Sequence, residues 1–246
     1  METLSTETPA LFAAAVSRAA AALRAGEVVA LPTETVYGLA ANAFNAMAVQ
    51  TIFRVKNRPS QNPIIVHVSS LEMAQQCVLE WPGPAQQMAD AFWPGPLTLV
   101  LRKSPRIPDN VTAGGRTVGI RWPSHPLMQA VIRACGFPLA APSANLSNRL
   151  SPTTAEHVRR GLADKVSLLV DGGYCHVGIE STVVDLASDP PRILRPGIIH
   201  AESVRAVIGD VKGGAPATAA ASEELRSPGQ LPKHYSPQAQ LRVWEW

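Results

Sequence analysis

Apolar residues along the chain follow two alternating patterns, one typical of helices and one typical of strands. Helical spacing predicts helices over residues 10–25, 45–57, 70–79, 84–92, 125–135, 153–160 and 201–208. Short apolar runs predict strands over residues 28–31, 64–68, 96–101, 117–122, 137–145, 167–171, 181–186 and 192–195. Strands that alternate with helices predict an α/β fold. The strand-rich stretch from 166 to 195 predicts antiparallel pairs within a mixed sheet.

The two ends of the chain differ from its middle. The alanine-rich start is interpreted as an ordinary first helix, because Glu2 and Glu7 stand where a signal peptide has positive charge. No apolar run reaches the roughly 20 residues of a membrane span, so we expect a cytoplasmic protein with no membrane contact. After residue 209 the composition becomes rich in Gly, Ala, Pro and Ser. We therefore expect a domain over 1–209, a linker over 210–237, and in 238–246 the start of a C-terminal domain that is missing.

Composition narrows the chemistry. Hydrophobic residues make up 46% of the 246 residues, enough for a sizeable core. The three cysteines, Cys77, Cys135 and Cys175, are far apart, which predicts isolated buried thiols rather than a zinc site or a disulfide framework. The net charge is only +3, but residues 50–125 carry eight Lys or Arg against four Asp or Glu. That local excess of positive charge favours an anionic ligand.

Two predicted strands carry polar side chains on one face. Period two places His67 opposite the apolar face of the strand at 64–68, where it is either a ligand contact or a structural histidine. On the predicted strand at 117–122, Thr117, Gly119 and Arg121 share a face. An arginine there either holds an anion such as a carboxylate or phosphate, or forms a structural salt bridge.

Small and polar residues also gather where other strands end. The segment 141–148 and Ser151 offer hydroxyls and an amide, either as a phosphate-binding loop or as a plain polar loop. Residues 33–35 (Thr-Glu-Thr) and 180–182 (Glu-Ser-Thr) lie at the ends of other strands, where α/β proteins bind ligands. The chain has no GxxxxGK[ST], GxGxxG, GxSxG or HExxH motif.

Long segments in a fixed order resemble a known family. They are LPTETVYGLAANA, IFRVKNRPSQNPIIVHV, FWPGPLTLVL, TVGIRWPSHP, PLAAPSANLSNRLSPT, GIESTVVDL, ILRPG and SPGQLPKHYSP. The sequence resembles the YrdC-like threonylcarbamoyl-AMP synthases in their longer form. The resemblance implies a twisted mixed sheet flanked by helices, similar to dihydroxybutanone-phosphate synthase, with a basic concave face. It also implies that L-threonine, bicarbonate and ATP give threonylcarbamoyl-AMP and pyrophosphate, with Mg²⁺ accompanying ATP. A downstream transferase then modifies tRNA next to the anticodon, and direct contact with tRNA is possible.

The resemblance assigns residues to each substrate. Those matched to L-threonine are Thr35, His67, Arg121, Ala141 and Ser181. Those matched to ATP are Lys56, Arg58, Asn62, Thr117, Ser143, Ser151, Arg195 and Tyr235. Lys56 and Arg58 are the expected catalytic residues, because they would stabilise charge on the phosphates. The SPGQLPKHYSP segment, with Tyr235, is expected to close over the site as a lid.

Three alternatives remain beside this interpretation. A non-catalytic RNA-binding module would use the basic face, although aromatic residues for base stacking make up only 5%. A carbamoyl-transfer enzyme of hydrogenase maturation would carry zinc-finger-like cysteines and an acylphosphatase segment, which the sequence lacks. A sugar-phosphate lyase of the dihydroxybutanone-phosphate synthase type would need an acidic metal cluster, which is not evident.

Overall fold

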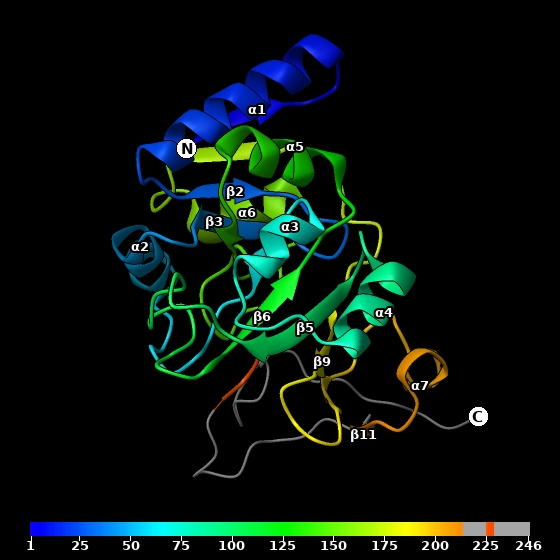
Figure 1. Cartoon of the computed structure of the whole chain (residues 1–246). Coiled ribbons are helices and arrows are strands. Elements are labelled where there is room, and N and C mark those ends of the chain that lie inside the picture. Colours follow the sequence, from blue (N-terminus) through cyan, green and yellow to red (C-terminus); the bar gives the residue numbers. More distant parts are fainter. Residues whose placement is uncertain (214–224, 229–246) are drawn as a thin grey trace, which may run out of the picture.

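The fold is built on one large mixed sheet, shown by a computed structural model that describes residues 1–213 and 225–228 (Figure 1). Within those residues the sheet has eleven strands in the order β1-β8-β2-β3-β7-β4-β6-β5-β9-β10-β11. The strands are β1 (Glu2–Ser5), β2 (Val29–Leu31), β3 (Gly38–Asn42), β4 (Val66–His67), β5 (Leu97–Arg102), β6 (Thr117–Arg121), β7 (Leu139–Ala140), β8 (Leu168–Asp171), β9 (Thr182–Asp185), β10 (Arg192–Arg195) and β11 (Lys212–Gly213). The helices are α1 (Pro9–Arg24), α2 (Ala46–Lys56), α3 (Leu71–Gln75), α4 (Gly83–Phe92), α5 (Pro126–Cys135), α6 (Ala155–Leu162) and α7 (Ala201–Ile208).

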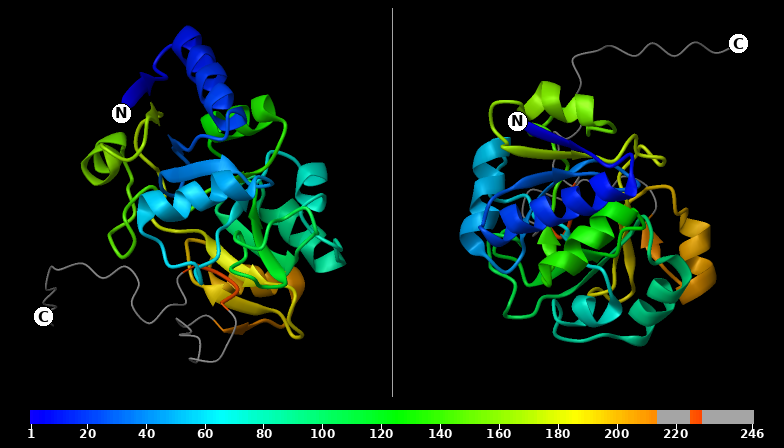
Figure 2. Two further views of the ribbon diagram at one scale, coloured as in Figure 1. Left: turned by 90° about the vertical axis from the view of Figure 1, so that its left-hand side faces the viewer. Right: turned by 90° about the horizontal axis from the view of Figure 1, so that it is seen from above.

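Helices cover both faces of the sheet. On one face α1 and α5 lie side by side over β2 and β8 (Figures 1 and 2). The strand β2 shows how the layers are separated, since Val29 and Leu31 pack with α1 while Ala30 packs in the second, larger apolar cluster. That second cluster includes the apolar sides of α2 and α6. The predicted α/β fold with a mixed sheet flanked by helices is therefore confirmed.

Three strands were not predicted from the apolar pattern. The start of the chain is not purely helical, because β1 pairs in parallel with β8 before α1 begins. The sequence of β3 is Gly-Leu-Ala-Ala-Asn, which has no β-branched residue and low intrinsic strand preference. It forms because antiparallel pairing with β2 and β7 satisfies its backbone. β11 lies inside the predicted linker and extends the sheet beyond β10.

Other elements exist but are shorter than predicted. The strand expected at 137–145 is reduced to β7, and the strand expected at 64–68 is reduced to β4. The helix expected at 70–79 ends at Gln75, and Val78 then bridges to Lys103. The strand face prediction at 64–68 holds: Ile64, Val66 and Val68 pack into the large core.

The pairing of β4 and β6 brings two predicted site residues together. These strands run parallel, and His67 is registered directly beside Arg121. Each is the last residue of its strand, so both side chains are at the carboxyl ends, where ligands bind in such sheets. The sheet thus places a buried imidazole and a buried guanidinium next to each other.

Two further features follow from the described residues. All three cysteines are buried free thiols, as the sequence predicts. No helix in the described ranges combines the length and the apolar character needed to cross a membrane. The expected start of a C-terminal domain at 238–246 and Tyr235 lie outside the described residues.

Candidate functional site

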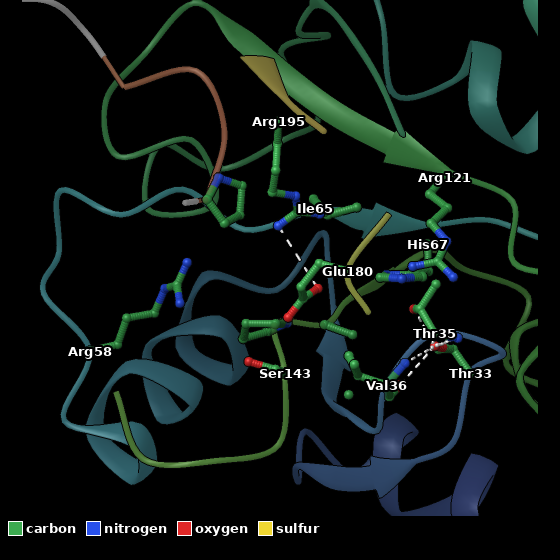
Figure 3. Close-up of a pocket in the computed structure, with 14 residues that line it drawn as sticks. Thr33, Thr35, Val36, Arg58, Ile65, His67, Arg121, Ser143, Glu180 and Arg195 are labelled. Carbon is green, nitrogen blue, oxygen red and sulfur yellow. Dashed lines mark hydrogen bonds and ion pairs between the residues drawn. The ribbon is translucent and has the colours of Figure 1, made fainter. Parts of the chain in front are cut away.

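A cavity opens at the carboxyl ends of β4 and β6 (Figure 3). On one side its walls come from the turn between β2 and β3, the segment after α2, and the ends of β4 and β6. On the other side they come from the loop after β7, the residue before Ser181 and β9, strand β10, and the segment 225–228. The lining residues are Thr33, Thr35, Val36, Gly38, Arg58, Ile65, His67, Arg121, Ala141, Pro142, Ser143, Glu180, Arg195 and Pro228. Figure 3 shows Arg121 and His67 together at one end, with Arg58 and Arg195 away from them.

The end with Arg121 is close to charge-neutral. The Arg121 guanidinium lies 2.8 Å from the buried carboxylate of Glu34 (Nη2 to Oε1). Burial acts to raise the pKa of Glu34, but the charge of Arg121 and backbone N–H groups outweigh it and the pKa is lowered. Burial, together with Arg121, lowers the pKa of His67 to about 3, so its imidazole is neutral near pH 7. His67 Nδ1 is buried with no hydrogen-bond partner among the described residues.

A tight turn presents Thr35 to the same end. The Thr33 hydroxyl donates to the Val36 carbonyl at 2.7 Å and accepts from the backbone N–H groups of Thr35 and Val36. Its Oγ1 is also 2.9 Å from that of Thr35. Either hydroxyl of that pair can donate, and the Thr35 hydroxyl can also accept a hydrogen bond from a ligand.

Ser181 lies behind the cavity wall rather than in it. It is fully buried, and its hydroxyl is 2.8 Å from that of Thr98. Arg195 donates to the Ser181 hydroxyl and carbonyl, each at 3.0 Å. The predicted threonine contact of Ser181 therefore stays a prediction, and its observed role is to orient Arg195. Ala141 does line the cavity, and its N–H donates to the carbonyl of Ile65.

The opposite end is lined by basic side chains. Arg58 lines it while donating to the carbonyls of Asn62 and Pro63. Arg195 lies 3.8 Å from the carboxylate of Glu180, which also accepts a hydrogen bond from Ser151 at 2.7 Å. Among the described residues, Arg58 and Arg195 line this end together with Glu180, and Lys56 lies nearby, so this end suits a strongly anionic group such as a phosphate chain.

Lys56 is buried beneath a loop and does not line the cavity. Its ammonium donates to the carbonyl of Ser143, and to the carbonyl and side-chain oxygen of Asn145 at 2.5 and 3.2 Å. Burial, reinforced by Arg58, lowers its pKa well below the usual value. Lys56 therefore shapes the loop that carries the Ser143 hydroxyl into the cavity, and its expected contact with phosphates stays a prediction.

Among the described residues, three other predicted ATP residues do not line the cavity: Asn62, Thr117 and Ser151. Asn62 is buried and holds the turn before β4, with its N–H donating to the carbonyl of Pro59. Thr117 starts β6, about 13 Å along the strand from Arg121, and lines a second cavity. Tyr235 lies outside the described residues. Their contacts with ATP also stay predictions.

Four residues in or beside the cavity have no role assigned from the sequence. Glu34 and Glu180 are noticed only as carboxylates at strand ends, and Thr98 and Pro228 are not singled out. Pro228 lines the cavity, while its neighbour Arg226 pairs with Asp185 at 2.9 Å. In the sequence, Pro228 belongs to the SPGQLPKHYSP motif, which is expected to close over the site.

Comparison with known proteins agrees with this geometry. The Sua5_yciO_yrdC family model, described as "Telomere recombination", matches residues 21–197. The Sua5_C model, described as "Threonylcarbamoyl-AMP synthase, C-terminal domain", matches residues 199–246. An α/β fold with a ligand cavity at parallel strand ends and this family match define the class: the chain belongs to the Sua5/YciO/YrdC family.

Particular members are similar over nearly the whole chain. The threonylcarbamoyl-AMP synthase of Bacillus subtilis is 47% identical over 234 residues, covering 94% of this chain and 66% of the relative. That of Pyrococcus abyssi is 43% identical over 227 residues, covering 92% and 67%. The crystal structure of P. abyssi Sua5 complexed with L-threonine superposes with a TM-score of 0.89 at 40% identity, covering 97% of this chain and 69% of that one. The chain thus spans about two thirds of the length of these relatives.

Proposed function

We propose that this chain is an L-threonylcarbamoyladenylate synthase, an ATP-dependent nucleotidyltransferase that combines L-threonine, bicarbonate and ATP into threonylcarbamoyl-AMP and pyrophosphate. The observation that carries the proposal is the division of one cavity into two ends. Arg121, His67 and Thr35 at the neutral end suit an amino acid, and Arg58, Arg195 and Ser143 at the basic end suit the phosphates of ATP. The names of the close relatives support the same activity.

The mechanism follows from this division. Arg121 binds the threonine carboxylate by a charge-assisted pair. The threonine amine attacks the carbon of bicarbonate or of an activated form of it, and water or the activating group leaves. The resulting carbamate oxygen attacks the α-phosphorus of ATP, and the bond to pyrophosphate breaks. Arg58 and Lys56 stabilise the developing phosphate charge, so catalysis comes from positioning and electrostatics rather than from a covalent nucleophile.

Magnesium is proposed as the companion of ATP. The cavity supplies one lining carboxylate, Glu180, which already accepts from Ser151 and faces Arg195. Among the described residues no group of three or more His, Cys, Asp or Glu converges on one point. This donor set fits an ion ligated mainly by phosphates and water, with Glu180 as the protein oxygen within reach of its shell. The ion would neutralise phosphate charge during transfer.

The product implies a partner. An acyl-adenylate is reactive, so we propose that a downstream transferase takes the threonylcarbamoyl group to the adenosine beside the anticodon of tRNA. We place this in the cytoplasm, where unpaired thiols such as Cys77 and Cys135 persist. Direct contact of this chain with tRNA is a further part of the proposal.

We also propose that the SPGQLPKHYSP motif closes over the cavity and excludes water during the reaction. The place of Pro228 in the cavity wall supports this. Replacing Tyr235 by Ala is expected to weaken ATP affinity and turnover, measured by titration and by pyrophosphate release. Unchanged affinity and turnover would contradict closure by this motif.

The first experiment is incubation with ATP, Mg²⁺ and bicarbonate, with and without L-threonine. Pyrophosphate release and mass spectrometry follow the product. Adenylate that requires both threonine and bicarbonate is the expected result. Absence of product together with no binding of threonine or ATP would contradict the proposal. If RNA then bound with a steep dependence on salt, a non-catalytic RNA-binding module would replace it.

A further inference from the structure

Glu34 lies directly behind the amino-acid end of the cavity without lining it. Its side chain is only 9% exposed, and its Oε1 is 2.8 Å from Nη2 of Arg121. Arg121, in contrast, is part of the cavity wall. Glu34 comes from the turn between β2 and β3, whereas Arg121 ends β6, so the pair joins two separate parts of the sheet. The carboxylate is thus placed to act on a ligand only through the guanidinium.

Two contacts fix the plane of that guanidinium. Glu34 meets Nη2, and the carbonyl of Gly95 accepts from Nε at 3.3 Å. Gly95 is itself tied to the end of β6, since its N–H donates to the carbonyl of Trp122 at 2.8 Å. A guanidinium has five N–H donors in a rigid plane, so contacts at two nitrogens set its orientation and leave donors for a ligand.

Charge gives Glu34 a second effect. Arg121 is 3% exposed, and its registered neighbour His67 is neutral near pH 7. Without Glu34, Arg121 would be a buried cation with no ion-pair partner among the described residues, which proteins rarely sustain in a fixed place. With Glu34 the pair is neutral overall. The guanidinium can therefore remain in the cavity wall before any ligand arrives.

We propose that Glu34 is a positioning residue that holds Arg121 in the orientation needed to receive the carboxylate of the amino-acid substrate. The inference rests on the proposed threonine site. It concerns the side chain alone: the Glu34 backbone carbonyl accepts from the N–H of Val177 at 2.9 Å, and a side-chain substitution keeps that bond. A purely structural ion pair would stabilise the fold without favouring one substrate over the other.

The test measures L-threonine and ATP binding separately by calorimetry in Glu34→Gln, with the exposed Glu7→Gln as matched control. For Glu34→Gln we expect the threonine Kd to rise about tenfold, roughly 1.4 kcal/mol, while the ATP Kd stays within twofold. The KM for threonine should rise in parallel, and kcat at saturating threonine should change little. An unchanged threonine Kd would overturn the inference. Equal losses of both affinities with a lower melting temperature would also overturn it, because they indicate a structural role.

Two further variants make the result specific. In an Arg121→Lys background, adding Glu34→Gln should change the threonine Kd less than twofold, because lysine has no planar fork to orient. Independent, additive losses would contradict action through Arg121. Glu34→Asp keeps the charge on a shorter side chain, and it tests the same point if the glutamine variant fails to fold. We expect a threefold rise in the threonine Kd, and an unchanged Kd would contradict the inference.

Binding also separates this inference from the proposed function. If the wild-type chain binds threonine and yields no adenylate, the synthase proposal fails while the Glu34 effect on threonine Kd is still measured. If the wild-type chain binds ATP but no threonine, Arg121 is not an amino-acid site and the inference fails with it.

Discussion

The two ends of the cavity each depend on a buried cation, and these cations have different partners. Arg121 is paired with the carboxylate of Glu34. Lys56, among the described residues, hydrogen-bonds the neutral oxygens of Ser143 and Asn145. One end therefore holds a buried cation paired with a buried carboxylate, whereas basic side chains gather at the other end and suit an anionic ligand.

This difference matches two kinds of ligand. A zwitterionic amino acid carries no net charge, and a neutral site can orient its carboxylate without a large change in overall charge. A triphosphate is strongly anionic, and its binding is favoured by a cluster of cations. The contrast predicts that substitutions at the two ends separate threonine binding from ATP binding.

The largest effect is expected from removal of Arg121. In Arg121→Leu the Glu34 carboxylate would be buried without its counter-charge, which lowers the free energy of unfolding by about 3 kcal/mol or more. Threonine binding should be lost. Urea denaturation and calorimetry measure the two effects.

The double variant Glu34→Leu with Arg121→Leu provides the control for that prediction. It removes both charges, so most of the stability should return while threonine binding stays absent. Stability that remains low in the double variant would show that the ion pair is not the source of the loss.

A smaller and differently directed effect is expected at Lys56. Lys56→Met removes the donor of the Asn145 carbonyl and one of the two donors of the Ser143 carbonyl, at about 1–3 kcal/mol of stability. Because that loop carries the Ser143 hydroxyl, ATP affinity should fall more than threonine affinity. The exposed Lys165→Met is the matched control. Parallel losses of both affinities would remove the distinction between the two ends.

The neutral end should also make stability depend on pH through His67. The folded pKa is about 3, below the ordinary value of 6.5, so the unfolded chain takes up a proton that the folded chain refuses. Stability is therefore full above pH 6.5 and falls as the pH drops toward 3, on the order of 3 kcal/mol by pH 4. His67→Gln should flatten that part of the profile in urea titrations. An identical slope would assign the acid sensitivity to other groups.

The smallest effect is expected at Arg226, which lies two residues before Pro228 in the chain and forms an ion pair with Asp185. Asp185 keeps its bonds from the Ala187 N–H and the Ser188 hydroxyl, and the Arg226 side chain is 38% exposed. Arg226→Ala should therefore lower stability by less than about 1 kcal/mol. It should raise the ATP KM two- to threefold in a turnover assay. The exposed Arg192→Ala is the matched control and should leave the ATP KM unchanged. A larger threonine effect than ATP effect would contradict this placement.

The sequence predicted the parts of the site that depend on local periodicity. Alternation alone placed His67 and Arg121 on strand faces, and the register of β4 with β6 then brought them together. It could not predict that Glu34 is the partner of Arg121, because that contact depends on how a distant turn is positioned over the sheet. It left open a structural salt bridge at Arg121, and the structure contains one.

The missed strands have a similar physical reason. The Gly-Leu-Ala-Ala-Asn stretch of β3 has no local preference for extended structure, and only pairing with β2 and β7 creates it. Lys56 illustrates the same limit for side chains. Its position in the sequence predicted a contact with phosphates, whereas in the fold it lies beneath the loop that carries Ser143 and Asn145.

The cavity wall takes residues from nearly the whole described chain, beginning with Thr33 and ending with Pro228. A ribosome delivers the N-terminal part first, so this wall is complete only when residue 228 has emerged. Ligands consequently have no finished site to bind during early synthesis. A ligand that binds the assembled site would stabilise the folded chain by an amount set by its concentration relative to Kd.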